Sequence, residues 1–316
     1  MVAGAASFVA VVVCTPLCMA AAGRLGIVDH PGPLKPQSAA VPYLGGVAVF
    51  VALLVSSWNR LGLIGPLAVA TAIGVADDAV DLPPLVRLVG QGVVGVLVAT
   101  VVTSRLPPAA AVVVAIVATT VLVNGANMVD GIDSLLTTIV AVAAAGIALL
   151  HGGPSRQLAL ALACASVGFL VYNRTPARVY LGDGGSYLFG AALAELLLLS
   201  WAPRVRPSVG AGVLLVVAVP VLELGLTVLR RIRAGGSPMA GDRGHSYDRM
   251  VAAGLTVPMV VLVLGAVQVL LSALGVAIGA SGSLVVAVPV VVVTAAALLG
   301  VAVRFGLLVP HGGARQ

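Results

Sequence analysis

Apolar positions in this chain come in long runs that short polar connections separate. About eleven such runs lie near residues 3–22, 44–58, 61–76, 87–103, 108–124, 135–150, 157–172, 187–202, 209–229, 251–278 and 283–303. Most approach the roughly 20 apolar residues that an α-helix needs to cross the ~30 Å hydrocarbon core of a bilayer. The pattern predicts an all-α fold, a polytopic transmembrane helical bundle of about 10–11 helices.

The polar connections leave no room for a separate soluble domain, since the longest have about twenty residues. The first apolar run lacks the preceding basic region and the small-residue cleavage site of a secretory signal peptide. We therefore expect a retained first span and a single integral-membrane domain over residues 1–316. Composition agrees, because charged residues are only 9% of the chain, whereas soluble domains carry about 25%.

The basic residues predict an orientation. With the N-terminus outside, twelve of the 17 Lys and Arg residues fall in one set of loops and five in the other. The larger set comprises Arg24, Lys35, Arg87, Arg174, Arg178, Arg230, Arg231, Arg233, Arg243, Arg249, Arg304 and Arg315, and the smaller set Arg60, Arg105, Arg156, Arg204 and Arg206. Cytoplasmic loops carry the excess of Lys and Arg, so the larger set is predicted to be cytoplasmic. No basic domain exists to present the +6 net charge to nucleic acid, and we expect no such partner.

Aspartates gather on the same predicted face. All nine lie in or beside loops near residues 23–43, 77–87, 124–134, 173–186 and 230–250, and only Glu195 and Glu223 lie elsewhere. Ordinary solvated loops would mix Lys, Glu, Ser and Gln, whereas these loops set Asp beside Asn and Gly. Because acidic groups at membrane depth are usually functional, we expect the loops to form one shared site.

The first candidate is Asp77-Asp78-Ala-Val-Asp81, which ends an apolar run. Two adjacent carboxylates in a partly dry site need a cation, or one of them takes a raised pKa and acts as a base. If the helix continues through this stretch, one of the pair shares a face with Asp81. The alternative is a helix cap followed by a solvated turn.

The second stretch spaces polar residues by three, at Asn124, Asn127, Asp130 and Asp133, with Gly131 among them. At the end of a helix these residues lie broadly on one face. Asn offers a donor and an acceptor to a base or sugar, and Asp binds a metal or a hydroxyl. This pattern predicts a polar ligand.

Two further loops carry chemistry. Asp183 stands among glycines at the start of an apolar run, which suits a ligand for a hard cation beside backbone N–H groups free to meet phosphate, or else a plain glycine turn. In the last loop Asp242, Arg243 and His245 lie close together in sequence, a combination that can bind a diphosphate or transfer a proton.

Together these loops resemble the polyprenyl-phosphate N-acetylhexosamine-1-phosphate transferases, the membrane enzymes of glycosyltransferase family 4. The resemblance runs from about residue 24 to 249. D-D-A-V-D at 77–81 is similar to the family's D-D-x-x-D, and the stretch from Asn124 matches N-x-x-N-x-x-D-G-x-D-G-L except for Ser134. L-G-D-G-G-S-Y-L-F-G matches G-D-x-G-S-x-x-x-G, and the first loop keeps Asp29 and Lys35.

The resemblance implies an enzyme that transfers a sugar-1-phosphate from a UDP-sugar to a polyprenyl phosphate and releases UMP. It implies Mg²⁺, with Mn²⁺ as the alternative, bound by Asp183 with the Asp77 and Asp78 pair close by, and Asp77 activating the lipid phosphate. Catalytic residues would be Asp77, Asp78, Asp130 and His245. Substrate-binding residues would be Lys35, Asp81, Asn124, Asn127, Asp133, Asp242 and Arg243.

Two departures from the family pattern bear on which sugar nucleotide the protein uses as donor. The family's usual H-x-H-H is His245-Ser-Tyr247-Asp248 here, and its basic pair and histidine in the first loop become Leu34-Lys35-Pro36-Gln37. The lost histidines disfavour the pentapeptide-transferase branch. They also keep a catalytically silent paralogue as an alternative, although every motif aspartate is retained.

A transporter is the rival from another class. It predicts acids at mid-membrane and internal symmetry, neither of which the chain shows. We expect a multi-pass protein of the cytoplasmic membrane with its active site on the cytoplasmic face, serving cell-envelope polysaccharide synthesis. A homodimer is compatible with the sequence, which carries no signature of oligomeric state.

Overall fold

The computed structural model describes residues 2–31, 40–57, 60–237, 239 and 244–309. Over these residues the chain forms thirteen helices and one two-stranded β-ladder. The helices are α1 (Val2–Leu25), α2 (Gly45–Ser56), α3 (Leu61–Val80), α4 (Pro84–Val101), α5 (Pro108–Val129), α6 (Leu135–Leu150), α7 (Gly153–Asn173), α8 (Gly182–Leu199), α9 (Pro207–Val216), α10 (Ala218–Arg233), α11 (Ser246–Ala252), α12 (Val257–Ser281) and α13 (Leu284–Arg304). The strands are β1 (Val28–Asp29) and β2 (Val41–Pro42), which pair antiparallel.

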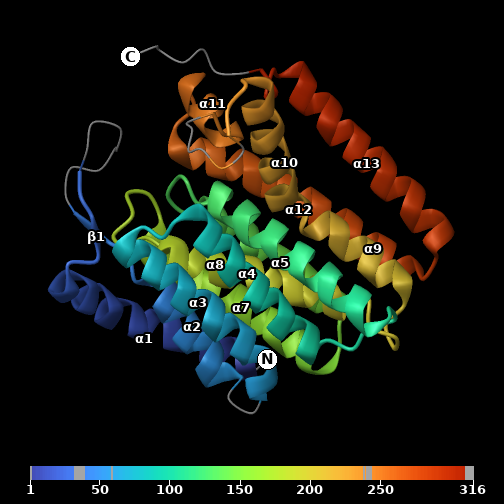
Figure 1. Cartoon of the computed structure of the whole chain (residues 1–316), viewed down its shortest axis with the longest axis horizontal. Helices are drawn as coiled ribbons and strands as arrows, with labels where there is room; N and C mark the ends of the chain where they lie inside the picture. Colours follow the sequence, from blue (N-terminus) through green and yellow to red (C-terminus); the bar gives the residue numbers. More distant parts are fainter. Residues whose placement is uncertain (1, 32–39, 58–59, 238, 240–243, 310–316) are drawn as a thin grey trace.

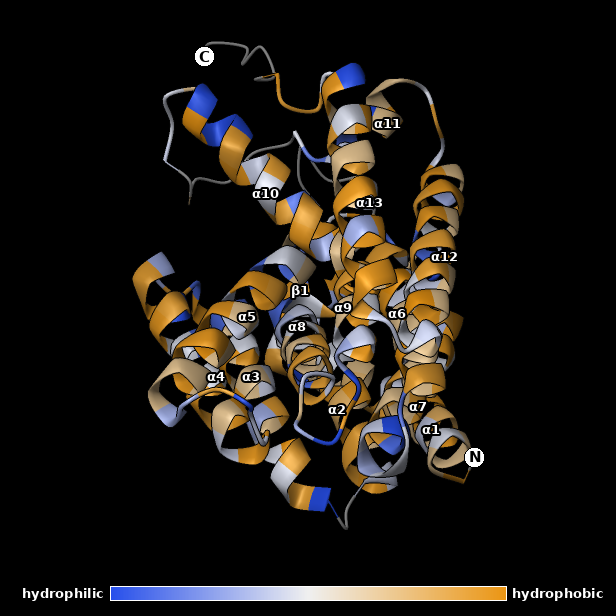
Figure 2. Ribbon diagram, turned by 90° about the vertical axis from the view of Figure 1, so that its right-hand side faces the viewer, coloured by the Kyte–Doolittle hydropathy of each residue, from blue (hydrophilic) through white to orange (hydrophobic). Residues whose placement is uncertain are grey.

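The all-α polytopic fold is confirmed, and each predicted apolar run overlaps at least one helix. Among the described residues, seven helices are long and apolar enough to cross a membrane, or eight if α9 and α10 count as one bent span. The helices α2 and α6 are apolar but shorter. Figure 2 shows hydrophobic residues along most of the helices, with the most hydrophilic ones mainly at helix ends and in loops. The orientation of the N-terminus stays a prediction.

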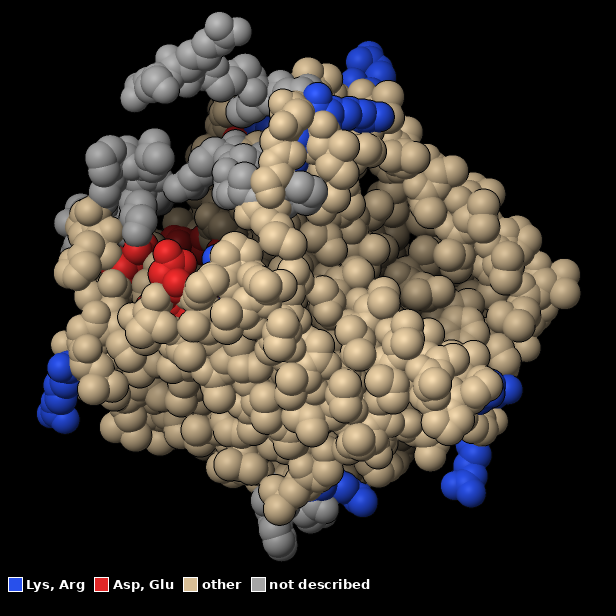
Figure 3. All heavy atoms as spheres, in the orientation of Figure 1, with Lys and Arg blue, Asp and Glu red and all other residues tan. Residues whose placement is uncertain are grey.

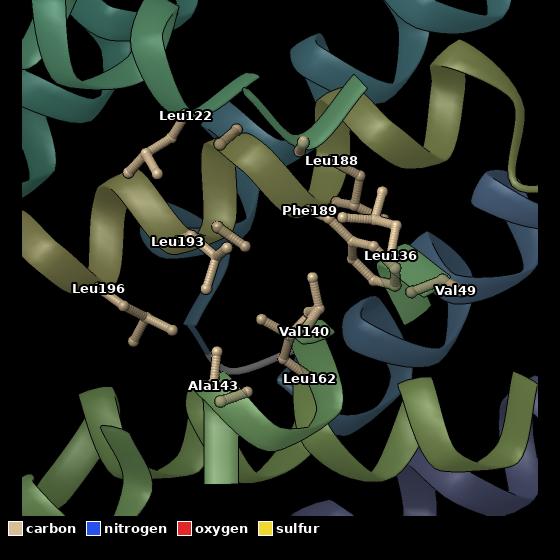
Figure 4. Packing of buried hydrophobic residues seen from close by; sticks show 14 of the residues in the cluster. Val49, Leu122, Leu136, Val140, Ala143, Leu162, Leu188, Phe189, Leu193 and Leu196 are labelled. Atoms are coloured by element: carbon tan, nitrogen blue, oxygen red, sulfur yellow. The ribbon is translucent and has the colours of Figure 1, made fainter. Parts of the chain in front are cut away.

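Helix α8 lies at the centre of the bundle, packed against α3 and α5 (Figure 1). Nearly all of its residues from Gly182 to Leu197 are buried. A helix that neighbours surround on every side must be apolar all round, which the run of Ala and Leu in α8 supplies. Figure 4 shows the result: Leu188, Phe189 and Leu193 of α8 lie between side chains of α5 and α6 in the core.

The N-terminal end of α8 crosses its neighbours at backbone contact distance. A side chain at Gly46 of α2 would overlap the backbone of Gly185, and one at Gly74 of α3 would overlap the backbone of Asp183. Small residues at helix crossings let membrane helices approach this closely. The three helices are thereby fixed around the start of α8, where the predicted site loops begin.

The predicted run at 209–229 is broken in the structure. Helices α9 and α10 meet at a bend of 57° next to Val217. Pro220 has no N–H, so it cannot donate to the carbonyl of Val216 four residues earlier, and such a loss kinks a helix. Gln268 of α12 supplies the missing donor, with its Nε2 2.8 Å from the Val216 oxygen. The Val216 carbonyl at the kink therefore keeps a hydrogen-bond donor inside the bundle.

The predicted run at 251–278 also differs at its start. The short helix α11 ends at Ala252, Gly254 takes a φ of +97°, and α12 begins only at Val257. Glycine adopts a positive φ without steric cost, so this turn lets α11 leave the line of α12. The predicted catalytic His245 directly precedes α11.

Candidate active site

Asp78 joins two loops that lie far apart in the sequence. Its Oδ1 accepts a hydrogen bond from the backbone N of Asp183 at 2.8 Å, and its Oδ2 accepts one from the backbone N of Gly184 at 3.1 Å. The carboxylate therefore caps the N-terminus of α8, where a negative charge is favoured. The expectation that these two N–H groups are free to meet phosphate is wrong, because Asp78 takes both.

Asp77 is buried and fully engaged. Its Oδ1 accepts from the backbone N of Leu82 at 2.9 Å, and its Oδ2 accepts from the Tyr187 hydroxyl at 2.8 Å. The Arg87 Nη1 lies 3.3 Å from the same Oδ2. The sequence did not single out Arg87 or Tyr187 as site residues, although Tyr187 follows Asp183 by one helical turn and Arg87 is the first charge after Asp81.

Asp81 lies apart from the pair. Helix α3 ends at Val80, and Asp81 follows in a left-handed conformation with φ 49°, which Asp tolerates better than most residues. The helix does not continue, so the expectation that Asp81 shares a helical face with Asp77 or Asp78 is wrong. Its side chain is 98% exposed, and its nearest charge is Arg87 at 3.9 Å.

The two predicted asparagines line the last turns of α5. Asn127 donates from Nδ2 to the Asp183 Oδ1 at 2.9 Å. One turn deeper, Asn124 donates from Nδ2 to the Gln91 Oε1 at 2.6 Å and to the Thr120 carbonyl at 2.8 Å. Helix α5 therefore presents its polar ending to the start of α8.

Asp130 directly follows the last residue of α5. Its side chain makes no hydrogen bond with any residue that the structure describes. Burial raises the pKa of Asp130 well above its ordinary range, and the carboxylates of Asp183, Asp78 and Asp133 add to the shift. A group in such surroundings gains from a cation or from a hydrogen-bond donor on a ligand.

A second layer of hydrogen bonds holds the turn after Asp130. Asp133 Oδ2 accepts from the backbone N of Ala177 at 3.0 Å. Asn173, which the sequence did not single out, accepts from the backbone N of Ser134 and the Thr137 hydroxyl and donates to the Val179 carbonyl. A polar residue at the end of an apolar helix was the only signal for it. These bonds fasten the loop before α8 to the turn after α5.

The first loop reaches the same region through its strands. The backbone N of Tyr180 donates to the Pro42 carbonyl at 2.8 Å, and the ring centroids of Tyr43 and Tyr180 lie 6.1 Å apart. Burial raises the pKa of the Tyr180 phenol to about 12, and the carboxylates of Asp133 and Asp29 add to the shift. Loops near residues 29, 78, 130 and 183 thus converge, as the sequence predicted (Figure 3, where the acidic side chains gather in one recess).

The oxygen donors in this recess suit a hard cation. Among the described residues, no group of three or more His, Cys, Asp or Glu side chains forms a ready-made metal cage. Mg²⁺ in phosphoryl-transfer sites is usually held by one or two carboxylates, water and the substrate phosphates rather than by such a cage. Asp183 and Asp130, close to each other and incompletely paired, therefore fit Mg²⁺ better than a structural metal.

His245 lies in the corner between α10 and α11 and is buried. Its Nδ1 is 3.0 Å from the Glu223 Oε1 of α10, and the Thr227 hydroxyl lies 3.3 Å away. Glu223 lies outside the loops that the sequence analysis singled out, and its contact with His245 was not foreseen. The predicted substrate residues Lys35, Asp242 and Arg243 lie outside the described residues.

An apolar cavity lies farther back along α5, beside its residues Val113–Leu122. It has a volume of about 490 Å³, and residues of α5, α8, α9, α10 and α13 line it. Figure 3 shows a hollow between α5 and α13. The same helix α5 ends before the polar turn that begins at Asp130.

The fold and the site define a polytopic helical membrane protein with a recess of carboxylates and amides at one end of its apolar helices. Comparison with known proteins gives its family. The model of glycosyl transferase family 4 matches residues 60–201. Decaprenyl-phosphate N-acetylglucosaminephosphotransferase of Mycobacterium tuberculosis is 30% identical over 77% of this chain and 73% of its own length.

Two further relatives carry related names. Undecaprenyl-phosphate alpha-N-acetylglucosaminyl 1-phosphate transferase of Yersinia pestis is 28% identical over 80% of this chain and 77% of its own length. The protein of that name from Escherichia coli O157:H7 is 26% identical over 81% and 77%. The chain belongs to glycosyl transferase family 4 and is a multi-pass phospho-sugar transferase of that family. The predicted family is confirmed.

Proposed function

We propose that this protein transfers an N-acetylhexosamine-1-phosphate from a UDP-sugar to a polyprenyl phosphate. The observation that carries the proposal is the convergence of Asp78, Asn127, Asp130 and Asp183 at the end of an apolar bundle. The relatives named above are called transferases that use polyprenyl phosphates and N-acetylglucosamine phosphate. The charged recess and the apolar cavity along α5 are the two kinds of surface that such substrates need.

The reaction is a displacement at phosphorus. An oxygen of the polyprenyl phosphate attacks the β-phosphorus of the UDP-sugar, the bond from the β-phosphorus to the bridging oxygen breaks, and UMP leaves with that oxygen. A phosphate monoester is largely ionised near pH 7, since its second pKa is about 6. Strong base catalysis is therefore unnecessary, and positioning with charge neutralisation provides most of the catalysis.

Asp183 is the proposed Mg²⁺ ligand, with Mn²⁺ as the alternative ion. Asp78 fixes the backbone of Asp183 and Asn127 fixes its Oδ1, so the carboxylate is held in place before substrate arrives. When bound, the ion neutralises the diphosphate charge in the transition state. Asp130, which lies close to Asp183, would add a second carboxylate.

The donor is proposed to lie against the end of α5. Asn124, Asn127, Asp130 and Asp133 would face the nucleotide-sugar, and His245 would approach its diphosphate from the α10–α11 corner. Lys35 and Arg243 are proposed to bring positive charge to the diphosphate, and Asp242 is proposed to be a further substrate-binding residue beside them. We place this site on the cytoplasmic face of the cell membrane, where UDP-sugars are available, at the first membrane step of a cell-envelope polysaccharide.

The acceptor is proposed to lie in the apolar cavity along α5. Its hydrocarbon chain would occupy the space between α5, α10 and α13, which only apolar side chains line. Its phosphate would reach the aspartates near Asp77 and Arg87. Arg87 is bound to Asp77 at 3.3 Å but remains 30% exposed, so it can also contact a phosphate.

Purified protein tests this function directly. With polyprenyl phosphate, Mg²⁺ and a panel of radiolabelled UDP-GlcNAc, UDP-GalNAc and UDP-glucose, we expect a lipid-linked product and stoichiometric UMP from an N-acetylhexosamine donor. Chelation by EDTA should stop the reaction, and added Mg²⁺ or Mn²⁺ should restore it. Folded protein that turns over none of these donors would support the silent-paralogue alternative.

A further inference from the structure

The corner between α10 and α11 is built around a buried carboxylate. Glu223 is 5% exposed and uses both of its oxygens. Its Oε1 accepts from the His245 Nδ1 at 3.0 Å and from the backbone N of Ser246 at 3.1 Å, and its Oε2 accepts from the Ser246 hydroxyl. A ring whose Nδ1–H is directed at a carboxylate has a fixed orientation. Glu223 therefore holds His245 in place.

His245 in turn holds a second ring. The imidazole of His245 and the phenol ring of Tyr247 stack at a centroid distance of 5.2 Å with 5° between their planes. Tyr247 is 4% exposed, so its ring is enclosed by protein. A buried aromatic ring that is stacked on a hydrogen-bonded neighbour has little freedom to move.

The far end of Tyr247 reaches the donor side of the site. Its hydroxyl lies against Gly131, and a Cβ at position 131 would overlap both the hydroxyl oxygen and the ring. Gly131 is the residue between Asp130 and the rest of the turn that ends in Asp133. A continuous series of contacts thus leads from Glu223 through His245 and Tyr247 to this turn.

We propose that Tyr247, held by Glu223 and His245, is a positioning residue that sets donor specificity. Its ring and hydroxyl pack against Gly131 and thereby fix the position of the Asp130–Asp133 turn. This inference rests on the proposed function, because it takes that turn to be the donor site. Tyr247 stands where the family pattern has histidine, so a phenol ring occupies this position in place of an imidazole.

A double-mutant cycle tests the contact in the full-length protein. Gly131→Ala should raise the KM for the UDP-sugar about tenfold, since a Cβ that overlaps the Tyr247 ring and hydroxyl must displace the turn. Tyr247→Ala should raise the same KM several-fold and lower the preference for UDP-GlcNAc over UDP-glucose. The double variant should resemble Tyr247→Ala alone, because removal of the ring removes the overlap. The KM for polyprenyl phosphate should stay within about twofold in all three.

Glu223 gives the second arm of the test. Glu223→Gln should raise the donor KM, whereas in a Tyr247→Ala background it should add nothing to that KM. Tyr247→Phe keeps the stacked ring but removes the hydroxyl that lies against Gly131, so it should raise the donor KM less than Tyr247→Ala does and leave the KM for polyprenyl phosphate within about twofold. Monodispersity in detergent is checked for every variant, so that a misfolded protein is not mistaken for a specificity change.

The outcomes separate the two proposals. Independent, multiplicative effects of Gly131→Ala and Tyr247→Ala, or an equal rise in KM for both substrates, overturn this inference while the proposed function stands. A wild-type protein that transfers sugar phosphate from no donor overturns the proposed function and this inference with it.

Discussion

Asp78 and Asp183 are neighbours in space but do different work. Both carboxylate oxygens of Asp78 accept hydrogen bonds from backbone N–H groups at the start of α8, whereas one oxygen of Asp183 accepts a hydrogen bond from Asn127. The first carboxylate therefore builds the site and the second is available to act in it. Substitutions at the two positions should separate stability from activity.

Asp183→Asn should reduce turnover by roughly 10²–10³-fold, the range typical for loss of an electrostatic contact to the transition state. The amide keeps the size of the side chain but loses its charge, so the thermal stability should change little. Turnover and Tm are measured on the same preparation. Asp81→Asn is the matched control, because Asp81 is exposed and its nearest charge is 3.9 Å away. Equal losses in both variants would remove Asp183 from the proposed metal site.

Asp78→Ala should destabilise the protein by about 1–2 kcal/mol through loss of a helix cap. The two N–H groups of Asp183 and Gly184 would then lie without their acceptor near the start of a buried helix. The fall in Tm should be present with and without Mg²⁺. An unchanged Tm would mean that water replaces the carboxylate as cap.

The polar residues of the site were predictable from the sequence, whereas their hydrogen-bond and ion-pair partners were not. The D-D-x-x-D, N-x-x-N-x-x-D and G-D-x-G patterns lead to Asp77, Asn127 and Asp183 because polar residues stand out in an apolar chain. The partners of Asp77 come from α4 and α8, so Arg87 and Tyr187 emerge only when the helices are packed. For the same reason, the sequence could not show that Asp78 occupies N–H groups that follow it by more than 100 residues.

At the scale of helices, the crossing of α3 with α8 depends on a glycine. A side chain at Gly74 would overlap the backbone of Asp183, and backbone cannot rotate out of the way. Gly74→Ala should therefore cost about 1–3 kcal/mol and lower turnover, since α8 must shift together with Asp183. Gly65 lies on the same helix with nothing within 4 Å of an added Cβ, so Gly65→Ala is the control and should leave both quantities unchanged.

The break between α9 and α10 depends on a pair of residues on different helices. Gln268→Leu removes the donor to the Val216 carbonyl and should lower stability by about 1–3 kcal/mol, the cost of a buried unpaired acceptor. Pro220→Ala supplies an N–H that can take over this carbonyl. The double variant should recover part of the lost Tm, whereas additive losses would show that Gln268 acts in another way.

Over the whole molecule, the apolar runs located the helices because a bilayer demands long stretches without charge. They could not reveal the bend at Val217, since Pro220 lies within an otherwise unbroken apolar run. They also gave no sign of α8 as the central helix, because periodicity alone does not distinguish a lipid-covered helix from one that protein surrounds. Orientation, which rests on the uneven distribution of Lys and Arg, is open to direct test.

The two ends of α7 provide that test. Arg156 and Arg174 are both exposed and lie at opposite ends of this one candidate span. In a background with Cys14, Cys18 and Cys164 replaced by serine, Arg174→Cys should react with a membrane-impermeant maleimide only in inside-out vesicles. Arg156→Cys should react in intact cells. The reverse pattern would place the aspartate recess outside and overturn the proposed cytoplasmic site.

The bond between Gln268 and the Val216 carbonyl also bears on how relatives of this chain diverge. As long as position 220 is proline, the main chain needs a donor from α12, and selection holds a polar side chain in the membrane at position 268. Once position 220 regains an N–H, that demand disappears and position 268 is free to become apolar. The two positions should therefore change together across lineages, with the loss of proline preceding the loss of glutamine.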